Sequence, residues 1–313
     1  MRDDGTMKVG ILGAGAVGLS LAARLSKVVQ VYAVARTRHV ARIRDEGFSL
    51  SGIWGEESCT FRCGENLPEK EQFDYFLITA KSVDTRQICD QFADVIAGRE
   101  VVSLQNGIGN EEIIAEYTDR VIGGMIITGF EWRGEASVHV SVEGGPIRLG
   151  RYPEGMDRAV FELVNVLRSA GLNVEGSQNI RSDLWGKALY NCALNPLGAL
   201  MGVNYGALSN PHAWEIITEI VSEIFSVASA EGVDLPWESP EAYLDYLEGT
   251  QLPATAGHHS SMLQDLRRGR ITEIGFLNGA IMERGQAHAI PVPFNTILTN
   301  LIRFKESLGG ARE

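Results

Sequence analysis

The sequence predicts an α/β chain in two parts, an N-terminal doubly wound sheet followed by a C-terminal all-α domain. Short apolar runs bounded by glycine or polar turns recur through the first half, and a glycine-rich turn follows the first of them. Nothing that resembles a strand appears after about residue 180. The 313 residues also suit two domains, since one domain commonly holds roughly 150 residues.

Apolar runs of this length suit strands that are buried on both faces of a parallel sheet. We expect strands at residues 8–12, 29–34, 73–79 and 100–104, with a helix at 17–26 after the first strand. Three later runs lack intervening helices, and they lie at residues 123–128, 137–142 and 146–149. We expect these three to form an antiparallel or mixed edge.

A helical pattern at residues 158–170 and a short strand at 173–175 complete the first part. The boundary is expected near residue 178, which gives domains 1–178 and 179–313. Glycines and prolines then separate a series of helical patterns. These patterns lie at residues 180–194, 213–230, 240–249, 260–268, 271–286 and 293–308.

The charge balance argues against several classes of partner. Lysine and arginine number 28 and aspartate and glutamate 40, a net charge of -12. Such a chain is poorly suited to bind nucleic acid or an anionic membrane, so an anionic ligand has to be met by a few local cations. No apolar stretch approaches the roughly 18 residues of a membrane span, and we expect a cytoplasmic protein.

The cysteines predict neither a metal site nor a disulfide framework. Cys59, Cys63, Cys89 and Cys192 are scattered, and the spacing of the first two differs from the usual zinc-ligand pairs. We therefore expect no metal and a reducing compartment.

The turn after the first expected strand has the pattern G-x-G-x-x-G. It consists of Gly13, Ala14, Gly15, Ala16, Val17 and Gly18. In this pattern Gly13 permits the tight turn, Gly15 lets the backbone approach a pyrophosphate, and Gly18 lets the helix pack on the strand. Helix N–H groups and the helix dipole then face the phosphates. We expect dinucleotide binding rather than a merely tight turn.

The end of the second strand indicates which dinucleotide binds. An acidic residue about 20 positions after the glycines would bond the ribose of NAD, whereas an arginine would accommodate the 2′-phosphate of NADP. The strand is followed by Arg36 and Arg38, with no acid until Asp45. This favours NADPH, the alternative being that both arginines are solvated loop charges.

Lys187, Asn191 and Asn195 are spaced four residues apart among apolar neighbours. Positions i, i+4 and i+8 project from one face of a helix. Lysine and asparagine cost free energy when they are buried without partners, so a stripe of this kind suggests a polar site. The alternative is an exposed polar face.

At this point the chain resembles the ketopantoate reductase (2-dehydropantoate 2-reductase) family from Met7 to about Lys305. The resemblance is carried by the glycine turn, by Gln105-Asn106-Gly107, by Lys187 with Asn191 and Asn195-Pro196, and by residues 260–265 followed by 272–274. It implies a Rossmann-type NADPH domain, a helical C-terminal domain and an active site in the cleft between them.

The resemblance also implies roles for individual residues. Lys187 matches the general acid, which protonates the C2 carbonyl oxygen as hydride arrives from the nicotinamide; an apolar cleft can lower the pKa of a lysine enough for this task. Asn106 matches the cofactor-binding residue near the nicotinamide that also positions Lys187 and the carbonyl, and Glu273 matches the glutamate at the hydroxyl end of the substrate. The other matched positions are Asn191, Asn195 and Ser261 on the substrate side and Lys81 on the cofactor side.

This assignment requires a bend between Ser261 and Glu273. A straight helix would separate two residues twelve positions apart by roughly 18 Å, too far to share a small substrate. We expect the break at Gly269.

Two positions depart from the pattern of the family. His258 stands where a substrate-binding asparagine is frequent, and Tyr205 stands where another asparagine is common. Both are candidate substrate-binding residues, and both suggest a pocket for a different 2-oxo acid.

The resemblance implies reduction of 2-dehydropantoate to pantoate for pantothenate biosynthesis, the route to coenzyme A. The alternatives are reduction of another 2-oxo acid in the same architecture and a non-catalytic NADPH-binding sensor. Periodicity leaves open whether the later apolar helices pack against a second copy, as in a homodimer, or against their own neighbours.

Overall fold

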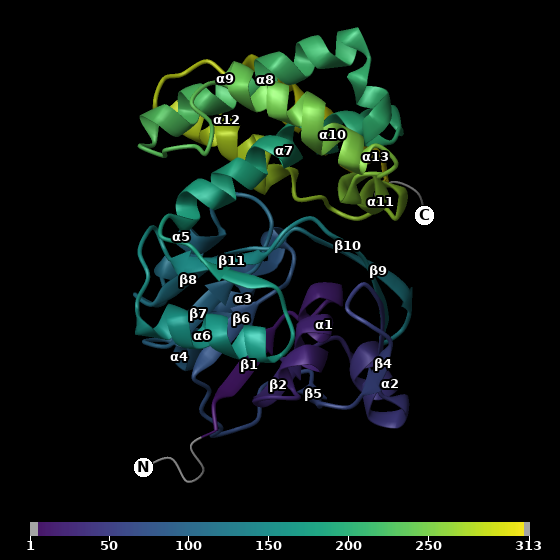
Figure 1. The fold of residues 1–313 in the computed structure, drawn as a ribbon, viewed down its shortest axis with the longest axis vertical. Helices are drawn as coiled ribbons and strands as arrows, with labels where there is room; N and C mark the ends of the chain where they lie inside the picture. The colour runs from purple at the N-terminus through teal and green to yellow at the C-terminus, as the bar shows by residue number, and fades with distance from the viewer. Residues whose placement is uncertain (1–5, 310–313) are drawn as a thin grey trace. The chain divides into compact units, whose positions relative to one another are not determined.

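The computed structural model describes residues 6–309 of the chain (Figure 1). These residues form two compact units, each with its own hydrophobic core. The first unit comprises residues 6–105 and 110–181, and the second comprises residues 106–109 and 182–309. The short segment 106–109 therefore belongs to the second unit although both of its neighbours in sequence belong to the first.

The first unit contains an eight-stranded sheet in the order β12-β11-β8-β7-β6-β1-β2-β5. Its pairing is parallel except between β8 and β11, which run antiparallel. The strands are β1 Lys8–Leu12, β2 Gln30–Val34, β5 Arg62–Gly64, β6 Tyr75–Ile78, β7 Glu100–Ser103, β8 Val121–Met125, β11 Ile147–Arg151 and β12 Val174–Gly176.

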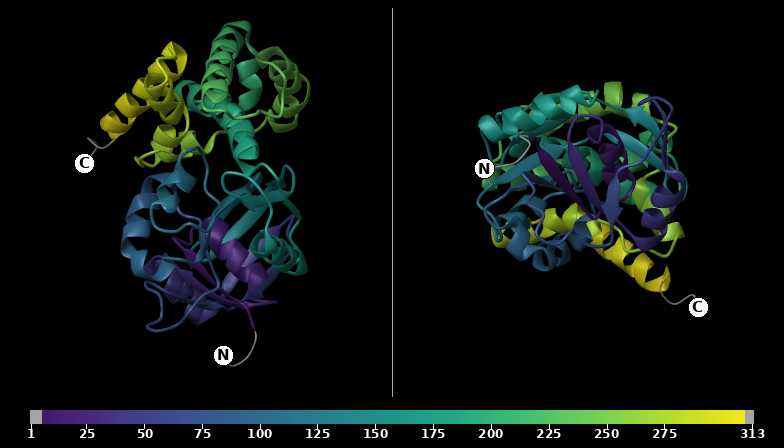
Figure 2. Two further views of the ribbon diagram at one scale, coloured as in Figure 1. Left: turned by 90° about the vertical axis from the view of Figure 1, so that its left-hand side faces the viewer. Right: turned by 90° about the horizontal axis from the view of Figure 1, so that it is seen from below.

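Helices cover both faces of this sheet. Because side chains alternate along a strand, Ile11 and Leu77 join the core on one face and Leu12 and Phe76 join the core on the other. The first face carries α1 Ala16–Leu25, α2 Thr37–Glu46 and α6 Arg158–Ser169, and the second carries α3 Thr85–Gln91, α4 Ala93–Ile96 and α5 Asn110–Ala115. The right view of Figure 2 shows the teal α6 and the blue helices on opposite sides of the strands. The doubly wound sheet predicted from the sequence is confirmed.

A second, four-stranded sheet in the order β4-β3-β10-β9 corrects one expectation. Of the runs expected to form a single edge, β8 and β11 lie in the large sheet, whereas β10 lies in the small one. Helix α1 explains the division, because nearly all its side chains are buried and it needs cover on its outer side as well. Phe48 and Val138 of the small sheet share a core with α1. The strands are β3 Phe48–Gly52, β4 Glu57–Cys59, β9 Thr128–Gly134 and β10 Ser137–Glu143.

Helices are the only regular secondary structure in the part of the second unit that the structure describes. Its core includes the fully buried rings of Trp185 and Tyr243. Its elements are α7 Ile180–Met201, η2 Tyr205–Ser209, α8 Pro211–Ala230, α9 Pro240–Tyr246, the π-helical η3 Leu247–Gln251, α10 Leu252–Thr255, α11 Ser261–Arg267, η4 Ile274–Phe276, α12 Asn278–Ala287 and α13 Pro293–Gly309. The predicted all-α domain is confirmed.

Two helices differ from their expected limits. Helix α7 continues through Pro196 to Met201 instead of stopping at residue 194. Proline has no N–H for the carbonyl of Cys192, but the side-chain amide of Asn278 donates to that carbonyl at 3.2 Å. The helix expected from residue 271 begins only at Asn278, because Thr272 is held in a non-helical segment by a hydrogen bond from its N–H to Glu306.

Between residues 6 and 309, no helix is both long and apolar enough to cross a membrane.

Candidate active site

The three glycines of the turn between β1 and α1 have different surroundings. Gly13 has a φ of +66°, and a Cβ placed on it would lie 2.5 Å from the Cβ of Ala80. A Cβ on Gly18 would lie 2.2 Å from Oγ1 of Thr79, so the helix packs closely on the sheet at this point. A Cβ on Gly15 would meet nothing within 4 Å. The first and third glycines are therefore required by the turn and the packing, and the second faces open space.

The N-terminus of α1 fits an anionic group. Gly15 is its N-cap residue, no side chain caps it, and its first turn contains no acidic residue. The first N–H groups of a helix lack partners within the helix, and the helix dipole makes this end positive. With open space above Gly15, the turn fits the diphosphate of a dinucleotide.

The edge of the sheet beyond β2 carries both signs of charge. Arg36 is exposed and is the N-cap residue of α2. Strand β5 runs beside β2, and the N–H of Ala35 donates to the carbonyl of Gly64 at 2.9 Å. The next residue, Glu65, accepts a hydrogen bond of 2.8 Å from the hydroxyl of Thr37. An acid thus lies beside the position expected to bind the ribose, although the first acid after β2 in sequence is Asp45.

A buried polar network holds the loop that carries Lys81. Nε2 of Gln105 donates to the carbonyl of Ala80 at 3.1 Å, on one side of the lysine. On the other side, Nδ2 of Asn110 donates to Oγ of Ser82 at 3.3 Å. These hydrogen bonds hold the residues on both sides of Lys81, at the carboxyl end of β6. Lys81 is half-buried there.

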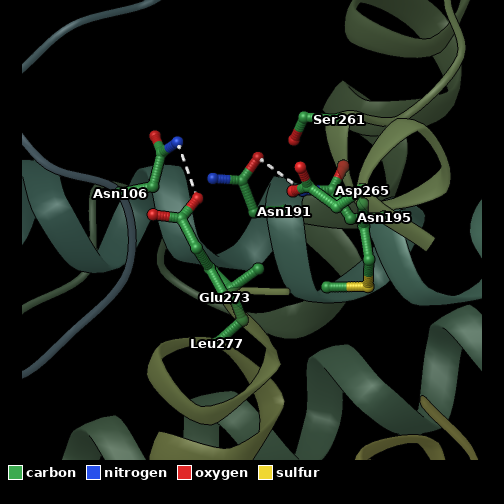
Figure 3. Close-up of a pocket in the computed structure, with 8 residues that line it drawn as sticks. Asn106, Asn191, Asn195, Ser261, Asp265, Glu273 and Leu277 are labelled. Carbon is green, nitrogen blue, oxygen red and sulfur yellow. Dashed lines mark hydrogen bonds between the residues drawn. The ribbon is translucent and has the colours of Figure 1, made fainter. Parts of the chain in front are cut away.

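A pocket in the second unit brings together most of the residues predicted to bind substrate (Figure 3). The predicted residues in its lining are Asn106, Asn191, Asn195, Ser261 and Glu273. Met262, Asp265 and Leu277 complete the lining, and none of them was predicted as a site residue from the sequence. Asp265 was missed because one acid near the end of a short helix has no distinguishing spacing.

Lys187 is linked to this pocket by a hydrogen bond to Asn106, which is one of the lining residues. Its Nζ donates to Oδ1 of Asn106 at 2.5 Å, although the lysine is not itself part of the lining. Nδ2 of the same amide donates to a carboxylate oxygen of Glu273 at 3.4 Å (Figure 3). The amide of Asn106 therefore joins a cation to an acid and has one defined orientation.

Asn106 is held in place by the segment that follows it. The N–H of Ile108 donates to the carbonyl of Phe276 at 2.8 Å. Gly107 has a φ of +87°, and a Cβ placed on it would lie 2.3 Å from the same carbonyl oxygen. Glycine at this position lets the loop contact η4 closely, and the contact sets the distance between Asn106 and Glu273.

The bend required between Ser261 and Glu273 is present. Helix α11 ends at Arg267, and Gly269 follows with a φ of +62°. The N–H of Arg270 turns back to the carbonyl of Asp265 at 2.9 Å. The chain reverses at the expected glycine, and both pocket residues reach the same cavity.

A second buried network holds the segment after Glu273 against α7. Nδ2 of Asn278 donates both to the carbonyl of Cys192 and to Oδ1 of Asn295. Asn295 in turn donates through its own Nδ2 to Glu223 at 2.7 Å. The network links α7, α8, α12 and α13, and therefore positions Glu273 relative to the polar face of α7.

The two residues that depart from the family pattern lie elsewhere. The side chain of His258 is exposed and outside the pocket lining, while its carbonyl accepts a hydrogen bond from the N–H of Tyr205. Tyr205 is buried, does not line the pocket, and donates its hydroxyl proton to Oδ1 of Asn195. Burial raises the pKa of Tyr205, so its hydroxyl keeps the proton that it donates.

No cluster of three or more His, Cys, Asp and Glu side chains suitable for a metal ion occurs within residues 6–309. The polar groups of the pocket are amides, a hydroxyl and carboxylates, with Lys187 beside them. This donor set can bind an oxo acid by hydrogen bonds and supply a proton from the ammonium group.

Comparison with known proteins gives consistent results for both halves of the chain. The family described as "Ketopantoate reductase PanE/ApbA" matches residues 9–154, and "Ketopantoate reductase PanE/ApbA C terminal" matches residues 179–306. A 2-dehydropantoate 2-reductase of Pyrococcus horikoshii is 34% identical over 314 residues, covering 97% of this chain and 99% of its own.

Two solved structures are similar over almost the whole chain. A PanE/ApbA family ketopantoate reductase from Ralstonia eutropha JMP134 has a TM-score of 0.88 at 30% identity and covers 97% of this chain and 100% of its own. A D-mandelate dehydrogenase with NADH and anilino(oxo)acetate has a TM-score of 0.87 at 27% identity, with the same coverage of 97% and 100%.

Proposed function

The chain belongs to the ketopantoate reductase family and is an oxidoreductase. On this basis we propose that it reduces 2-dehydropantoate to pantoate with NADPH, a step in the synthesis of pantothenate, the precursor of coenzyme A. The observation that carries the proposal is the hydrogen-bonded row of Lys187, Asn106 and Glu273 beside a pocket lined with amide side chains. A dinucleotide site without catalysis has no need of this arrangement.

Lys187 acts as the general acid. The nicotinamide cofactor, when bound, supplies the hydride that adds to the carbonyl carbon. The oxygen then needs a proton, and the ammonium of Lys187 gives one up, so the carbonyl becomes an alcohol. Asn106 orients this ammonium, because its Oδ1 accepts a hydrogen bond from one of the three N–H groups of Lys187.

The remaining pocket residues bind and orient the substrate. The amides of Asn191 and Asn195 and the hydroxyl of Ser261 offer donors to the carboxylate and carbonyl oxygens. Glu273 offers an acceptor to the hydroxyl end of the substrate. Several directed hydrogen bonds on a small molecule hold it in one orientation, which lowers the entropic part of the barrier.

The first unit holds the cofactor. The turn from Gly13 to Gly18 supplies N–H groups for the diphosphate, and Lys81 contributes a local cation. Arg36 at the end of β2 supports NADPH, because its guanidinium suits a 2′-phosphate.

The test follows the absorbance of NADPH with 2-dehydropantoate and a panel of other 2-oxo acids. We expect turnover of 2-dehydropantoate with the highest kcat/KM. Lys187→Ala should lower kcat by roughly 100- to 10,000-fold, the range for general acids, while NADPH still binds in a fluorescence titration. Lys187→Arg should be equally slow, because arginine keeps its proton. The exposed Lys305→Ala is the control and should keep full activity.

Near-normal turnover by Lys187→Ala would refute the role of the lysine. Absence of NADPH oxidation with every oxo acid would refute the reductase and favour the non-catalytic sensor.

A second candidate substrate is an aromatic 2-oxo acid. The similar structure of a D-mandelate dehydrogenase contains NADH and anilino(oxo)acetate. The panel therefore includes 2-oxo-2-phenylacetate, with NADH and NADPH in parallel. A higher kcat/KM for this acid than for 2-dehydropantoate would establish the alternative.

A further inference from the structure

Tyr205 is fixed in place behind the pocket. It is 5% exposed and begins η2. Its N–H donates to the carbonyl of His258 at 2.9 Å, and the N–H of Gly206 donates to the carbonyl of Ala256 at 2.8 Å. Its ring meets that of Tyr190 edge to face, with the centroids 5.8 Å apart. Both its backbone and its ring are therefore held while its hydroxyl donates to Asn195.

This hydroxyl donates to the acceptor end of the Asn195 amide. An asparagine amide has an acceptor at one end and a donor at the other. Because Oδ1 of Asn195 accepts from Tyr205, Nδ2 faces the other way and donates to Oδ1 of Asn191 at 3.4 Å. Asn195 is 7% exposed, so water is a poor substitute for either partner.

Asn191 takes its orientation from Asn195 in the same way. In Figure 3 its oxygen points to Asn195, and its nitrogen points to the side of the pocket where Asn106 and Glu273 lie. Tyr205, Asn195 and Asn191 thus form a row of two successive hydrogen bonds. At the end of the row, the side-chain N–H groups of Asn191 point into the cavity.

We propose that Tyr205 is a positioning residue for substrate binding, which orients the amides of Asn195 and Asn191 so that Asn191 presents donors to the oxygens of a 2-oxo acid. A reversed Asn191 would present its carbonyl oxygen, which repels a carboxylate. The inference rests on the proposed function in that the pocket receives an oxo acid. It assigns to Tyr205 an indirect role, in contrast to the direct contact expected from the sequence.

Tyr205→Phe tests the hydroxyl alone, because the buried ring is kept. We expect the KM for the oxo acid to rise by roughly three- to tenfold, the worth of one typical hydrogen bond. kcat, the KM for NADPH and the melting temperature should stay near those of the unmodified protein. Tyr190→Phe is the matched control, since it removes a hydroxyl from the adjoining ring that donates to Thr255 at 2.8 Å, away from Asn195. It should leave the KM unchanged.

An unchanged KM in Tyr205→Phe would overturn the proposal. An equal rise in Tyr190→Phe would also overturn it, because the effect would then be one of general packing.

A double-mutant cycle tests whether Tyr205 acts through Asn195. In an Asn195→Ala background, Tyr205→Phe should have no further effect on the KM, because the hydroxyl no longer has an amide to orient. Additive effects of the two substitutions would show that Tyr205 acts by another route.

A readout without turnover separates this inference from the proposed function. The side-chain amide signals of Asn195 and Asn191 in a ¹⁵N–¹H spectrum, assigned by their loss in Asn195→Ala and Asn191→Ala, should shift or broaden in Tyr205→Phe and not in Tyr190→Phe. Unchanged signals in Tyr205→Phe would overturn the inference even if the enzyme is active. Shifted signals in a protein that reduces no oxo acid would support the positioning role and refute the proposed function.

Discussion

At the scale of single residues, the asparagines of the pocket join neighbouring polar side chains by hydrogen bonds with a defined donor and acceptor. Asn106 accepts from Lys187 and donates to Glu273, and Asn195 accepts from Tyr205 through one end of its amide. Turning the amide of Asn106 by 180° would place its Nδ2 against the ammonium of Lys187 and its Oδ1 against the carboxylate of Glu273, so these two partners select one orientation. Amides suit this task because they supply direction without adding charge to a pocket that receives an anion.

The choice of cofactor is also made by individual residues. Under the proposed function, Arg36 would attract the 2′-phosphate of NADPH, whereas Glu65, which accepts a hydrogen bond from the hydroxyl of Thr37, would repel it. Both side chains are exposed, so their charges are screened, and each is worth about 1 kcal/mol at close range in water.

Glu65→Gln should therefore lower the KM for NADPH by roughly two- to fivefold and leave the KM for NADH nearly unchanged. Steady-state kinetics with both cofactors measure the ratio. Glu46→Gln is the control, because it changes the net charge equally at the last residue of α2. An equal fall in the KM for NADH would show that Glu65 does not act on the phosphate.

At the scale of elements, the segment 106–109 holds Asn106 in the pocket. It belongs to the second unit because Ile108 bonds to Phe276 and Gly107 permits close contact. The sequence pattern Gln105-Asn106-Gly107 marks a turn after β7, but it does not reveal which element the turn contacts. Packing against η4 decides this.

Gly107→Ala should displace Asn106, since its Cβ would overlap the carbonyl oxygen of Phe276. We expect kcat/KM to fall at least tenfold, while NADPH binding by fluorescence persists. Gly98→Ala is the matched control, because Gly98 has a φ of +63° but open space around it. The control should lose some stability from backbone strain and keep its activity. Comparable activity losses in the two variants would indicate strain rather than overlap.

The ends of the helices show which features can be predicted from residues that are close together in the sequence. The break at Gly269 was predictable, because a positive φ and a helix stop are local properties of glycine. The continuation of α7 through Pro196 was not, because the freed carbonyl of Cys192 is satisfied by Asn278, 86 residues away. Proline normally ends a helix, and here a side chain from α12 replaces its missing N–H.

At the scale of the whole molecule, the two units hold different parts of the chemistry. The glycine turn, Arg36 and Lys81 lie in the first unit, and every residue that lines the pocket lies in the second. With a net charge of -12, the few local cations are needed at these positions. The sequence predicted both groups of residues, and in the structure Asn106 is grouped with the helical second unit although the segments on either side of 106–109 belong to the first.

The thiols are expected to be unreactive throughout the molecule. All four cysteines are free, and burial raises the pKa of each, to about 11 for Cys59 and Cys89. A higher pKa leaves less thiolate at a given pH, and thiolate is the reactive form. For a pKa of about 11, only about 0.1% is thiolate at pH 8.

At pH 8 the native protein should therefore react with a disulfide reagent such as DTNB at least tenfold more slowly than free cysteine. All four thiols should react after denaturation, and alkylation under native conditions should leave activity unchanged. Rapid reaction of one native thiol would contradict the expectation and indicate an activated cysteine.

The sequence by itself determined the features that depend on neighbours along the chain. Strand and helix periodicity, the glycine turn, the common face of Lys187, Asn191 and Asn195, and the bend at Gly269 all follow from residues a few positions apart. Backbone sterics and helix geometry act over this range, so a pattern is enough to predict them.

Only the tertiary structure decided which distant side chains meet. It joins Asn106 to Glu273 across 167 residues, and it brings Glu65 to Thr37 and the hydroxyl of Tyr205 to Asn195. Such hydrogen bonds depend on how helices and strands pack, and no local spacing encodes that packing. The physical reason is that directed contacts between side chains need both partners placed within about 3 Å, which only the assembled core determines.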